Sequence, residues 1–441
     1  MAFKRKIYSV FSDWKRNWAG KRALLVQGAR RIGKSTIVEE FGKNEYKTYI
    51  LINFQTDLYK VEELFKNDIS DLDTFFRNLS LIYGTKLYER ESLIIFDEVQ
   101  LYPLARQSIK QLVADGRYDF IETGSLISLR QNVDKILIPS EEKSVNMYPM
   151  DFEEFLWAKG DEVTSEAIRQ AFESGKPLGD AAHRKIMKDF RLYMAVGGMP
   201  QAVAELLESN DFSRVDEVKR DILNLYENDL KKIDGSYKLY TSLIFKAIPS
   251  ELSSHSRLFK AATLGKNVRV SRNYNSFAAI NDSMIVNTAY NCADPHIGFA
   301  LTKDYSKQKI YMGDTGLLVT QIFRDSAEPI EESIYKEIIF NKLGINMGMI
   351  IENIVAQMLR ADGYEPFFHA FGRYEVDFII PDGKKLNALE IKSSAYKSHS
   401  LLDKFAVKFS DRIKNQYVIY SKDFKKEGNV TYLPFYMVMC L

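Results

Sequence analysis

Residues 23–36 read ALLVQGARRIGKST, a short apolar run followed by a segment rich in glycine and arginine. The second part fits the pattern G-x-x-x-x-G-K-[ST], in which Gly28, Gly33, Lys34 and Ser35 hold the fixed positions. The apolar run predicts a strand before the pattern, and the residues after it predict an amphipathic helix. A glycine-rich loop between a strand and a helix is the context in which this pattern cradles phosphate groups.

The residue types in this loop explain why it would bind phosphate. Glycines at both fixed positions let the backbone bend, so that successive N–H groups face inward at the start of a helix and attract an anion. The Lys34 ammonium can reach the β- and γ-phosphates, and the Ser35 hydroxyl can join the shell of a Mg²⁺ ion. The alternative is a tight turn with a solvated lysine. Two alternatives, phosphate contact or solvent, also stay open for Arg30 and Arg31.

A second motif stands at a suitable distance from the first. LIIFDEVQ (93–100) places Asp97 and Glu98 directly after four apolar residues, which predict a buried strand. Ligands bind at the carboxyl ends of the strands in open α/β sheets. We therefore expect Asp97 to hold Mg²⁺ and Glu98 to polarise the attacking water. Without the loop, the same pair would be a solvated strand end.

A third predicted strand, DFIETGS (119–125), ends at the same edge of the sheet. It presents Thr123 and Ser125 there, and two roles stay open for these hydroxyls. They either sense the γ-phosphate or cap a helix.

The composition is that of an ordinary globular protein. The chain has 441 residues, 46% of them hydrophobic and 27% charged, which is enough for about two to four domains. Its 61 basic and 59 acidic residues leave a formal charge of +2, so net charge does not argue for a polyanionic partner. Two distant cysteines, Cys292 and Cys440, argue against a disulfide framework and for a reducing cytoplasm. The sequence shows no signal peptide, no membrane span and no histidine cluster with metal-ligand spacing.

The pattern along the chain predicts several units. Strands and helical stretches alternate at first, which indicates an α/β domain with a mostly parallel sheet. From residue 151 the pattern is helical, and Gly197–Gly198 followed by Pro200 breaks one helix. Residues 236–320 then read as a small mixed unit, and the polar segment 322–333 is typical of a linker before the last helix and strands.

Five segments in a fixed order carry a resemblance that covers nearly the whole chain. They are the phosphate loop, DEVQ (97–100), TGS (123–125), YPMDFEEFLWA (148–158) and YMAVGGMPQAV (193–203). The series resembles a family of bacterial and archaeal AAA-type ATPases whose C-terminal domain is of unknown function and nuclease-like. Many members carry a glycine and an arginine shortly before P-x-x-F-E-E-F. Here that stretch is IPSEEKSV, with Lys143 the nearest base, so no arginine finger is assigned.

This resemblance implies an α/β fold class: an AAA-like P-loop NTPase parallel sheet with a helical lid, then winged-helix-like and restriction-nuclease-like domains. The implied boundaries are 1–150 for the ATPase core, 151–235 for the lid, 236–325 for the winged-helix-like unit and 335–441 for the nuclease-like domain. The implied ligands are ATP and Mg²⁺, with Ser35 and Asp97 on the metal and Lys34, Asp97 and Glu98 in catalysis. The predicted nucleotide-binding residues are Gly28, Ala29, Arg30, Arg31, Ile32, Gly33, Lys34, Ser35 and Thr36.

A second acidic site is predicted near the C-terminus, in VDFIIPDGKKLNALEIKSS (376–394). Folding this hairpin about residue 383 places Asp377 opposite Leu389 or Glu390, and strand alternation puts Glu390 and Lys392 on one face. The two carboxylates would then converge on a second divalent metal, with the lysine beside them. Glu352, on the preceding helix, stands where nucleases of the PD-(D/E)XK type often carry an extra acid, and the arrangement resembles theirs. The alternative is a solvated E-x-K on a half-exposed strand.

Two smaller candidates stay open. Glu375 is either a further metal ligand or a surface glutamate. Lys266, Arg269 and Arg272 precede a helix with an apolar face, and they would contact DNA phosphates, form a protein interface or be solvated.

The leading hypothesis is a cytoplasmic, Mg²⁺-dependent ATPase of AAA type whose nucleotide state moves its other domains. The alternatives are an ATP-gated nuclease acting on DNA or RNA, and a non-hydrolytic nucleotide switch that binds DNA or a protein partner. An oligomer is expected by analogy alone, and no membrane partner is expected.

Overall fold

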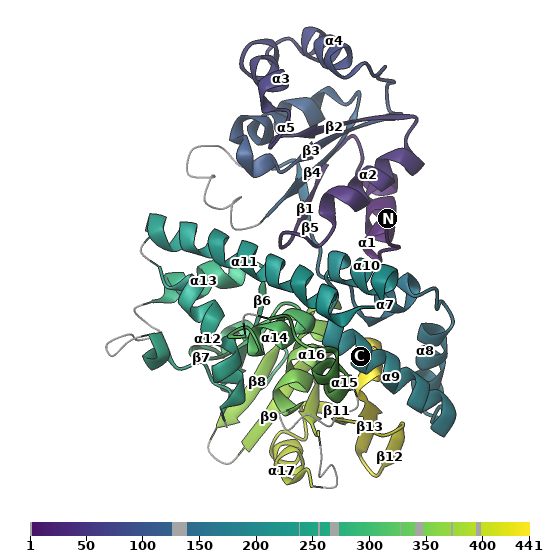
Figure 1. Cartoon of the computed structure of the whole chain (residues 1–441), viewed down its shortest axis with the longest axis vertical. Helices are drawn as coiled ribbons and strands as arrows, with labels where there is room; N and C mark the ends of the chain where they lie inside the picture. Colours follow the sequence, from purple (N-terminus) through teal and green to yellow (C-terminus); the bar gives the residue numbers. More distant parts are fainter. Residues whose placement is uncertain are drawn as a thin grey trace. The chain divides into compact units, whose positions relative to one another are not determined.

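The computed structural model describes residues 2–441 except 126–138, 238, 255, 265–272, 327, 340–346, 372–373 and 394–397. The chain divides into two compact units (Figure 1). The first comprises Met1–Tyr148 with Asp282–Met284, and the second comprises Pro149–Asn281 with Ile285–Leu441. Each unit is described by itself.

The first unit is built on a five-stranded parallel sheet with the strand order β2-β3-β4-β1-β5. The strands are β1 (Ala23–Gln27), β2 (Thr48–Asn53), β3 (Ser92–Asp97), β4 (Asp119–Gly124) and β5 (Glu142–Asn146). All six residues of β3 and all six of β4 are buried, and the apolar run LIIF of β3 is typical of a central strand. The predicted α/β domain with a parallel sheet is confirmed.

Helices cover both faces of this sheet. The helical segments are α1 (Ile7–Asn17), α2 (Lys34–Glu45), α3 (Leu58–Glu63), η1 (Leu64–Asp68), α4 (Leu72–Tyr83), η2 (Val99–Leu101) and α5 (Pro103–Asp115). Leu25, Ile94 and Phe96 pack in one cluster with apolar residues of α4 and α5. Alternate strand residues point to the opposite face, where α2 contacts β2, β3 and β4 and also α1.

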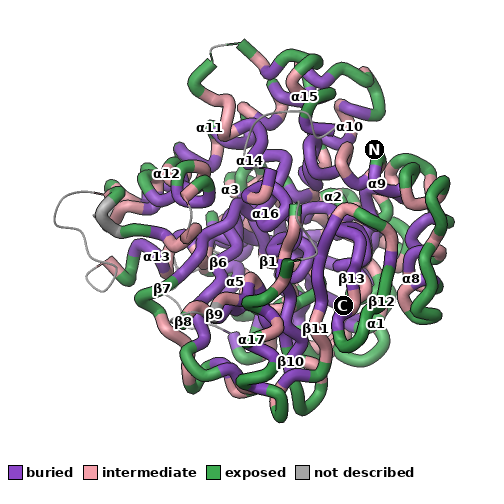
Figure 2. Tube along the Cα trace, turned by 90° about the horizontal axis from the view of Figure 1, so that it is seen from below, coloured by how far each residue is buried: buried purple, intermediate pink, exposed green. Residues whose placement is uncertain are grey.

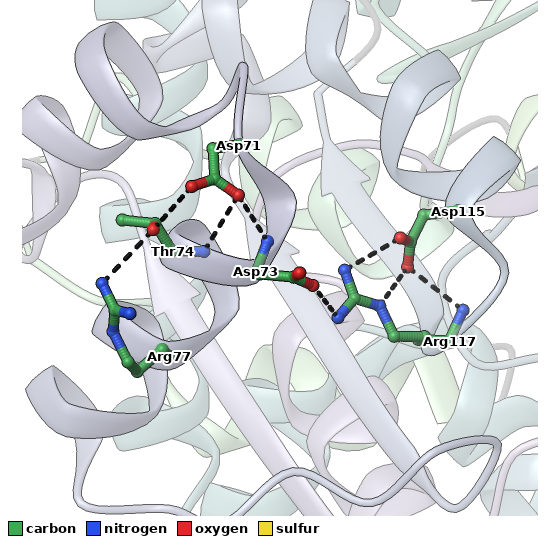
Figure 3. Close-up of polar contacts among 6 residues, drawn as sticks. All are labelled: Asp71, Asp73, Thr74, Arg77, Asp115 and Arg117. Atoms are coloured by element: carbon green, nitrogen blue, oxygen red, sulfur yellow. Dashed lines mark hydrogen bonds and ion pairs between the residues drawn. The ribbon is translucent and has the colours of Figure 1, made fainter.

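The start of α4 is fixed by a polar cluster shown in Figure 3. The Asp71 carboxylate caps the helix, since it accepts hydrogen bonds from the N–H of Asp73 and from both the N–H and the hydroxyl of Thr74. The Arg117 guanidinium, just before β4, pairs with Asp73 at 2.7 Å and with Asp115 at 2.8 Å. These contacts tie the first turn of α4 to the segment between α5 and β4.

The second unit combines many helices with a second sheet. Its helical segments are α7 (Phe152–Ala158), α8 (Thr164–Ser174), α9 (Asp180–Val196), α10 (Pro200–Ser209), α11 (Phe212–Tyr237), α12 (Thr241–Ser253), η4 (Ala261–Leu264), α13 (Tyr274–Asp282), η6 (Phe299–Leu301), α14 (Thr315–Ile322), α15 (Glu332–Ile339), α16 (Met347–Ala361), α17 (Ser400–Lys408) and η7 (Phe435–Cys440). Almost all of α16 is buried, as the purple tube at its label in Figure 2 shows.

An eight-stranded mixed sheet runs through this unit in the order β12-β13-β11-β10-β9-β8-β6-β7. The strands are β6 (Val286–Cys292), β7 (Lys303–Met312), β8 (Phe367–Phe371), β9 (Tyr374–Asp382), β10 (Lys385–Ile391), β11 (Ile413–Tyr420), β12 (Lys425–Glu427) and β13 (Val430–Pro434). β6 pairs with β8 in parallel through Tyr290 and Phe367. The sheet therefore crosses the boundary predicted between residues 325 and 335. Hydrogen bonds between strands that are far apart in the sequence join the two predicted domains. No local sequence pattern reveals such pairing.

The segment 322–333, predicted to be a linker, is held against α11 in its described residues. Ile330 is buried, and its N–H donates to the Asp216 carboxylate at 3.0 Å. The Arg220 guanidinium donates to the carbonyl of Glu328 at 2.9 Å. A polar composition with one proline is typical of linkers, but here the segment packs on a helix, so the linker prediction is wrong.

The break predicted at Gly197–Gly198 is a tight junction between α9, α10 and the start of α14. The Gly198 N–H donates to the carboxylate of Asp314, the N-cap residue of α14, at 2.6 Å. The Gly198 carbonyl accepts from the Met150 N–H at 2.7 Å. A Cβ atom on Gly198 would lie 1.9 Å from the Met150 carbonyl oxygen, so the junction has room only for glycine.

Gly198→Ala should therefore destabilise the chain by about 3 kcal/mol, because a backbone atom must move to admit the methyl group. The measurement is urea unfolding followed by circular dichroism. Gly235→Ala is the matched control, since Gly235 lies in α11 with nothing within 4 Å of the added carbon. The control should be as stable as the wild type or slightly more so. Equal stability of Gly198→Ala and the wild type would contradict the packing described.

Candidate functional site

The phosphate-binding pattern lies between β1 and α2, as predicted, and two of its glycines have separate structural reasons. Gly33 has a φ of 92°, in the left-handed region that favours glycine, and it is the N-cap residue of α2. Gly28 is required by close approach, because a Cβ atom there would lie 2.4 Å from both the Ile32 side chain and the Met147 carbonyl oxygen. Arg31 adopts a φ of 67° without being glycine. The loop is thus strongly bent over a few residues.

The ammonium of Lys34 is enclosed by the bent loop. It donates to the carbonyl of Gly28 at 3.0 Å and to that of Ala29 at 2.8 Å, and the residue is only 5% exposed. Burial lowers the pKa of Lys34 to about 8, against the opposing charges of Glu98 and Asp97. The loop therefore holds a weakly solvated cation where the pattern predicts one.

The carboxylate of Asp97, at the end of β3, is the meeting point of the site. One oxygen accepts hydrogen bonds from the hydroxyl of Ser35 at 2.6 Å and from that of Thr123 at 2.5 Å. The other accepts from the side-chain amide of Asn53, at the end of β2, at 2.8 Å. Three strand ends and the phosphate loop therefore converge on one buried carboxylate, at the carboxyl edge of the sheet.

Glu98 follows Asp97 in an unusual backbone conformation, with φ 57° and ψ 44°. Its N–H donates to the Thr123 hydroxyl at 3.2 Å, and its carboxylate accepts a hydrogen bond from the side-chain amide of Gln100. A left-handed conformation is strained for a residue with a side chain. Thr123 and Gln100 together fix this conformation.

Three residues of this site were missed by the sequence analysis. Two of them could have been predicted from the sequence. Asn53 ends an apolar strand, and Gln100 belongs to DEVQ. The third, Arg5, donates to the carbonyls of Ile32 at 2.9 Å and Tyr148 at 2.7 Å. A lone arginine near the N-terminus gives no signal of that kind.

The remaining predicted loop residues differ in exposure. Ile32 and Ala29 are buried, Arg30 is half-buried, and Arg31 and Thr36 are exposed. Thr123 bonds Asp97 and Glu98 at the end of its strand rather than capping a helix. Lys143 lies on β5 with its ammonium 5.1 Å from the centre of the Trp18 ring.

The residues present suit Mg²⁺. The Ser35 hydroxyl and the Asp97 carboxylate are hard oxygen donors 2.6 Å apart, and this is the donor type that the ion prefers. Both neighbours of Asp97 on that oxygen are neutral hydroxyls, so the negative charge of the carboxylate is not cancelled there.

An open surface pocket of about 570 Å³ lies elsewhere on the first unit, beside α4. It is lined by Asp73, Phe76, Arg77, Ser80, Leu81, Gly84, Thr85, Lys86, Leu87, Arg117 and Tyr118. These residues precede β3 and β4, at the amino edge of the sheet, and none belongs to the predicted site.

The C-terminal candidates are partly brought together. β9 and β10 pair about Gly383 from Lys385↔Asp382 to Leu389↔Phe378, in agreement with the expected hairpin. The Asp377 carboxylate accepts from the Ile391 N–H at 2.8 Å. Glu390 pairs with Lys392 at 2.6 Å, and burial raises the pKa of Glu390.

Glu352, predicted as an extra acid of the nuclease-like site, is surrounded by hydrogen-bond donors of the protein itself. It is fully buried on α16, and its carboxylate contacts Lys309, Tyr311 and Arg257. Among the residues that the structure describes, no group of three histidine, cysteine or acidic side chains is arranged to hold a metal ion. The second divalent metal predicted there has no support.

The predicted basic residues of the middle unit, Lys266, Arg269 and Arg272, lie outside the described residues. Phe277 and Ile280, on the helix that follows them, are buried on α13. Glu375 is half-buried on β9.

Comparison with known families agrees with the geometry of the first unit. Residues 20–156 match an AAA domain family. The first unit is therefore similar to AAA domains over most of its length. Residues 187–328 and 347–437 match two domains of unknown function, DUF8612 and DUF4143. The resemblance to AAA-type ATPases with a C-terminal domain of unknown function is confirmed.

Similar proteins add little beyond this. An uncharacterized protein of Methanocaldococcus jannaschii is 22% identical over 435 residues, which cover 94% of this chain and 84% of that protein. A chain of Drosophila ORC bound to DNA has a TM-score of 0.29 at 13% identity, covering 73% of this chain and 94% of that one. A STAND ATPase from Pyrococcus horikoshii has a TM-score of 0.28 at 13% identity, covering 82% of this chain and 48% of that one. Among the described helices, none has the length and apolarity that crossing a bilayer requires.

The lowered pKa of Lys34 predicts that nucleotide affinity depends on pH. Below about pH 8 the ammonium is charged before binding, and above it the free protein must take up a proton, because phosphate charges raise this pKa again. The dissociation constant for a non-hydrolysable Mg·ATP analogue should therefore rise by up to about tenfold per pH unit above about pH 8.

The measurement is titration calorimetry near pH 7.5 and near pH 9 in two buffers of different ionisation enthalpy. Proton uptake is expected at the higher pH. Lys34→Arg should show no such uptake from this position, because a guanidinium stays charged throughout this range. Equal uptake in both proteins would contradict the assignment to Lys34.

Proposed function

We propose that this protein binds ATP with Mg²⁺ in its AAA domain and hydrolyses it. The observation that carries the proposal is the convergence on Asp97. Its carboxylate contacts the Ser35 hydroxyl of the phosphate loop, and its charge acts on the buried ammonium of Lys34. A cation and a carboxylate that can hold a second cation are what a triphosphate with its metal requires.

Lys34 and the loop would bind the phosphates. The ammonium now donates to two neutral carbonyls within its own loop. Charge-assisted hydrogen bonds to phosphate oxygens are roughly twice as strong as bonds to neutral acceptors, so a triphosphate would compete well for it. Ser35 and Asp97 would hold Mg²⁺, whose chemistry is to neutralise charge on the phosphates. The remaining loop residues, Gly28 to Gly33 and Thr36, would line the phosphates.

Glu98 is the residue proposed to activate water. It stands one position beyond Asp97, at the same edge of the sheet. The hydrogen bonds from Gln100 to its carboxylate and from its own N–H to Thr123 hold it in one orientation. A positioned carboxylate of this kind contributes to water attack as a general base.

The nucleotide state would act on the rest of the chain through Thr123, which contacts both Asp97 and Glu98. We propose that three parts respond to the nucleotide state: the lid over 151–235, the winged-helix-like unit over 236–325 and the nuclease-like domain over 335–441. No arginine finger is assigned in this chain, so we propose that a neighbouring subunit supplies one. The active form would then be an oligomer, and we propose that it acts in the cytoplasm.

Lys34→Ala should abolish ATP binding, because it removes the buried cation beside the phosphates. The measurement is calorimetry with Mg²⁺ and a non-hydrolysable ATP analogue. Lys43→Ala is a matched control from the same helix, where Lys43 pairs with Glu39 on the surface. The control should bind like the wild type. Unchanged affinity in Lys34→Ala would refute the proposed site.

Glu98→Gln should bind ATP normally and lower turnover by about 10²-fold or more, because the amide cannot accept the proton of the attacking water. Phosphate release under saturating Mg·ATP measures it. Glu91→Gln serves as control, since Glu91 is exposed and pairs with Lys47 before the same strand. Turnover equal to the wild type in Glu98→Gln would remove Glu98 from the mechanism.

Two alternatives are ranked below this proposal. The first, a nucleotide-gated nuclease, would rest on the placement of Asp377 beside β10, which carries Glu390 and ends one residue before Lys392. Incubation with ATP, Mg²⁺ or Mn²⁺ and samples of DNA and RNA, with Asp377→Ala beside it, separates this function from ATP hydrolysis alone. The second alternative is a switch that binds DNA or a protein partner. ATP binding without phosphate release would favour it.

A further inference from the structure

The second unit contains a buried cluster of opposite charges around Glu352. This carboxylate is fully buried and accepts hydrogen bonds from the Lys309 ammonium at 3.1 Å and the Tyr311 hydroxyl at 2.5 Å. Its other oxygen pairs with the guanidinium of Arg257. Lys309 and Tyr311 come from β7 and Arg257 from the segment after α12, so residues distant in sequence meet on one side chain of α16.

The cluster continues to the two acids of the β9–β10 hairpin. The Lys309 ammonium lies 3.9 Å from one oxygen of Asp377, and the other oxygen of Asp377 accepts the Ile391 N–H. Glu390 is paired with Lys392. Three carboxylates are thus paired with three cations in this region, and the charge of a fourth carboxylate, Glu375, also acts on Lys309.

Carboxylates that are already paired with cations of the protein do not suit a divalent metal. Mg²⁺ and Mn²⁺ bind where carboxylate oxygens are available to them, usually six donors in all. Here Glu352 is already neutralised by two cations, and the ammonium of Lys309 lies between it and Asp377. A metal would have to displace that ammonium, which is only 2% exposed and would remain buried without a partner. One oxygen of Glu390 lacks a hydrogen-bond donor in the described part of the chain, but one oxygen makes no metal site.

We infer that Glu352, Asp377, Arg257 and Lys309 form an internal ionic clamp in place of a divalent-metal site. The clamp joins β7 and the Arg257 segment to α16 and β9. It joins the predicted winged-helix-like part to the predicted nuclease-like part. Because the acids are used in the clamp, they do not support metal-dependent cleavage of a phosphodiester. The clamp is independent of the nucleotide site, so either can fail without the other.

The direct test is Mn²⁺ binding to the full chain without nucleotide, followed by the electron paramagnetic resonance signal of free Mn²⁺. Wild type and Asp377→Asn should give the same isotherm, because any metal held by Ser35 and Asp97 is common to both. A binding site present in the wild type and lost in Asp377→Asn would overturn the inference.

The second test is thermal stability, which separates a clamp from a catalytic acid. Glu352→Gln should lower the Tm by on the order of 10 °C, since it leaves buried cations without a counter-charge. Glu332→Gln, on α15 where the exposed Glu332 pairs with Lys336, should leave the Tm within a few degrees. Acids kept for catalysis usually reduce stability, so an unchanged or higher Tm in Glu352→Gln would overturn the clamp. If Glu352→Gln fails to fold, the Mn²⁺ comparison decides alone.

Discussion

The hydrogen bonds received by the Asp97 carboxylate are the constraint on which the carboxyl edge of the first sheet depends. They come from Ser35 at the start of α2, from Asn53 at the end of β2 and from Thr123 at the end of β4. A parallel sheet brings these positions together only if its strand ends are level, which the registers of β2, β3 and β4 provide. The phosphate loop, Asp97 and Glu98 are therefore fixed relative to one another by contacts within the protein.

Buried carboxylates occur in both units, and the charge of their donors distinguishes their roles. Asp97 is held by two hydroxyls and an amide, all neutral, so its negative charge remains available to a cation. Glu352 is held by an ammonium, a guanidinium and a hydroxyl, so its charge is already compensated inside the protein. Removing one partner of a buried pair leaves an uncompensated charge, so losing any member of the second arrangement would destabilise the fold. The same residue type is thus left open to a cation in one unit and is compensated by cations of the protein in the other.

What the sequence could predict depends on how local each signal is. The phosphate loop, DEVQ and the β9–β10 hairpin are set by residues close in sequence, and the structure places each where spacing put it. The roles of Asn53, Arg257 and Lys309 depend on contacts that span about 40 to 95 residues of chain, which no local pattern records. The failure of the linker prediction has the same origin, since Ile330 is buried by a helix that begins more than 100 residues earlier.

Two buried lysines show why environment alone does not identify a ligand site. Lys34 and Lys219 are each enclosed, each donates to two backbone carbonyls, and burial lowers the pKa of each to about 8. The carbonyls around Lys34 belong to its own bent loop, within six residues, at the edge of a sheet. Those around Lys219, Ala195 and Gly316, belong to α9 and α14, so this ammonium joins two helices across the interior. A ligand can replace the first pair of carbonyls by rearranging one loop, whereas replacing the second would separate the helices. The difference in what each ammonium holds is therefore the physical reason to assign phosphate binding to Lys34 and a structural role to Lys219.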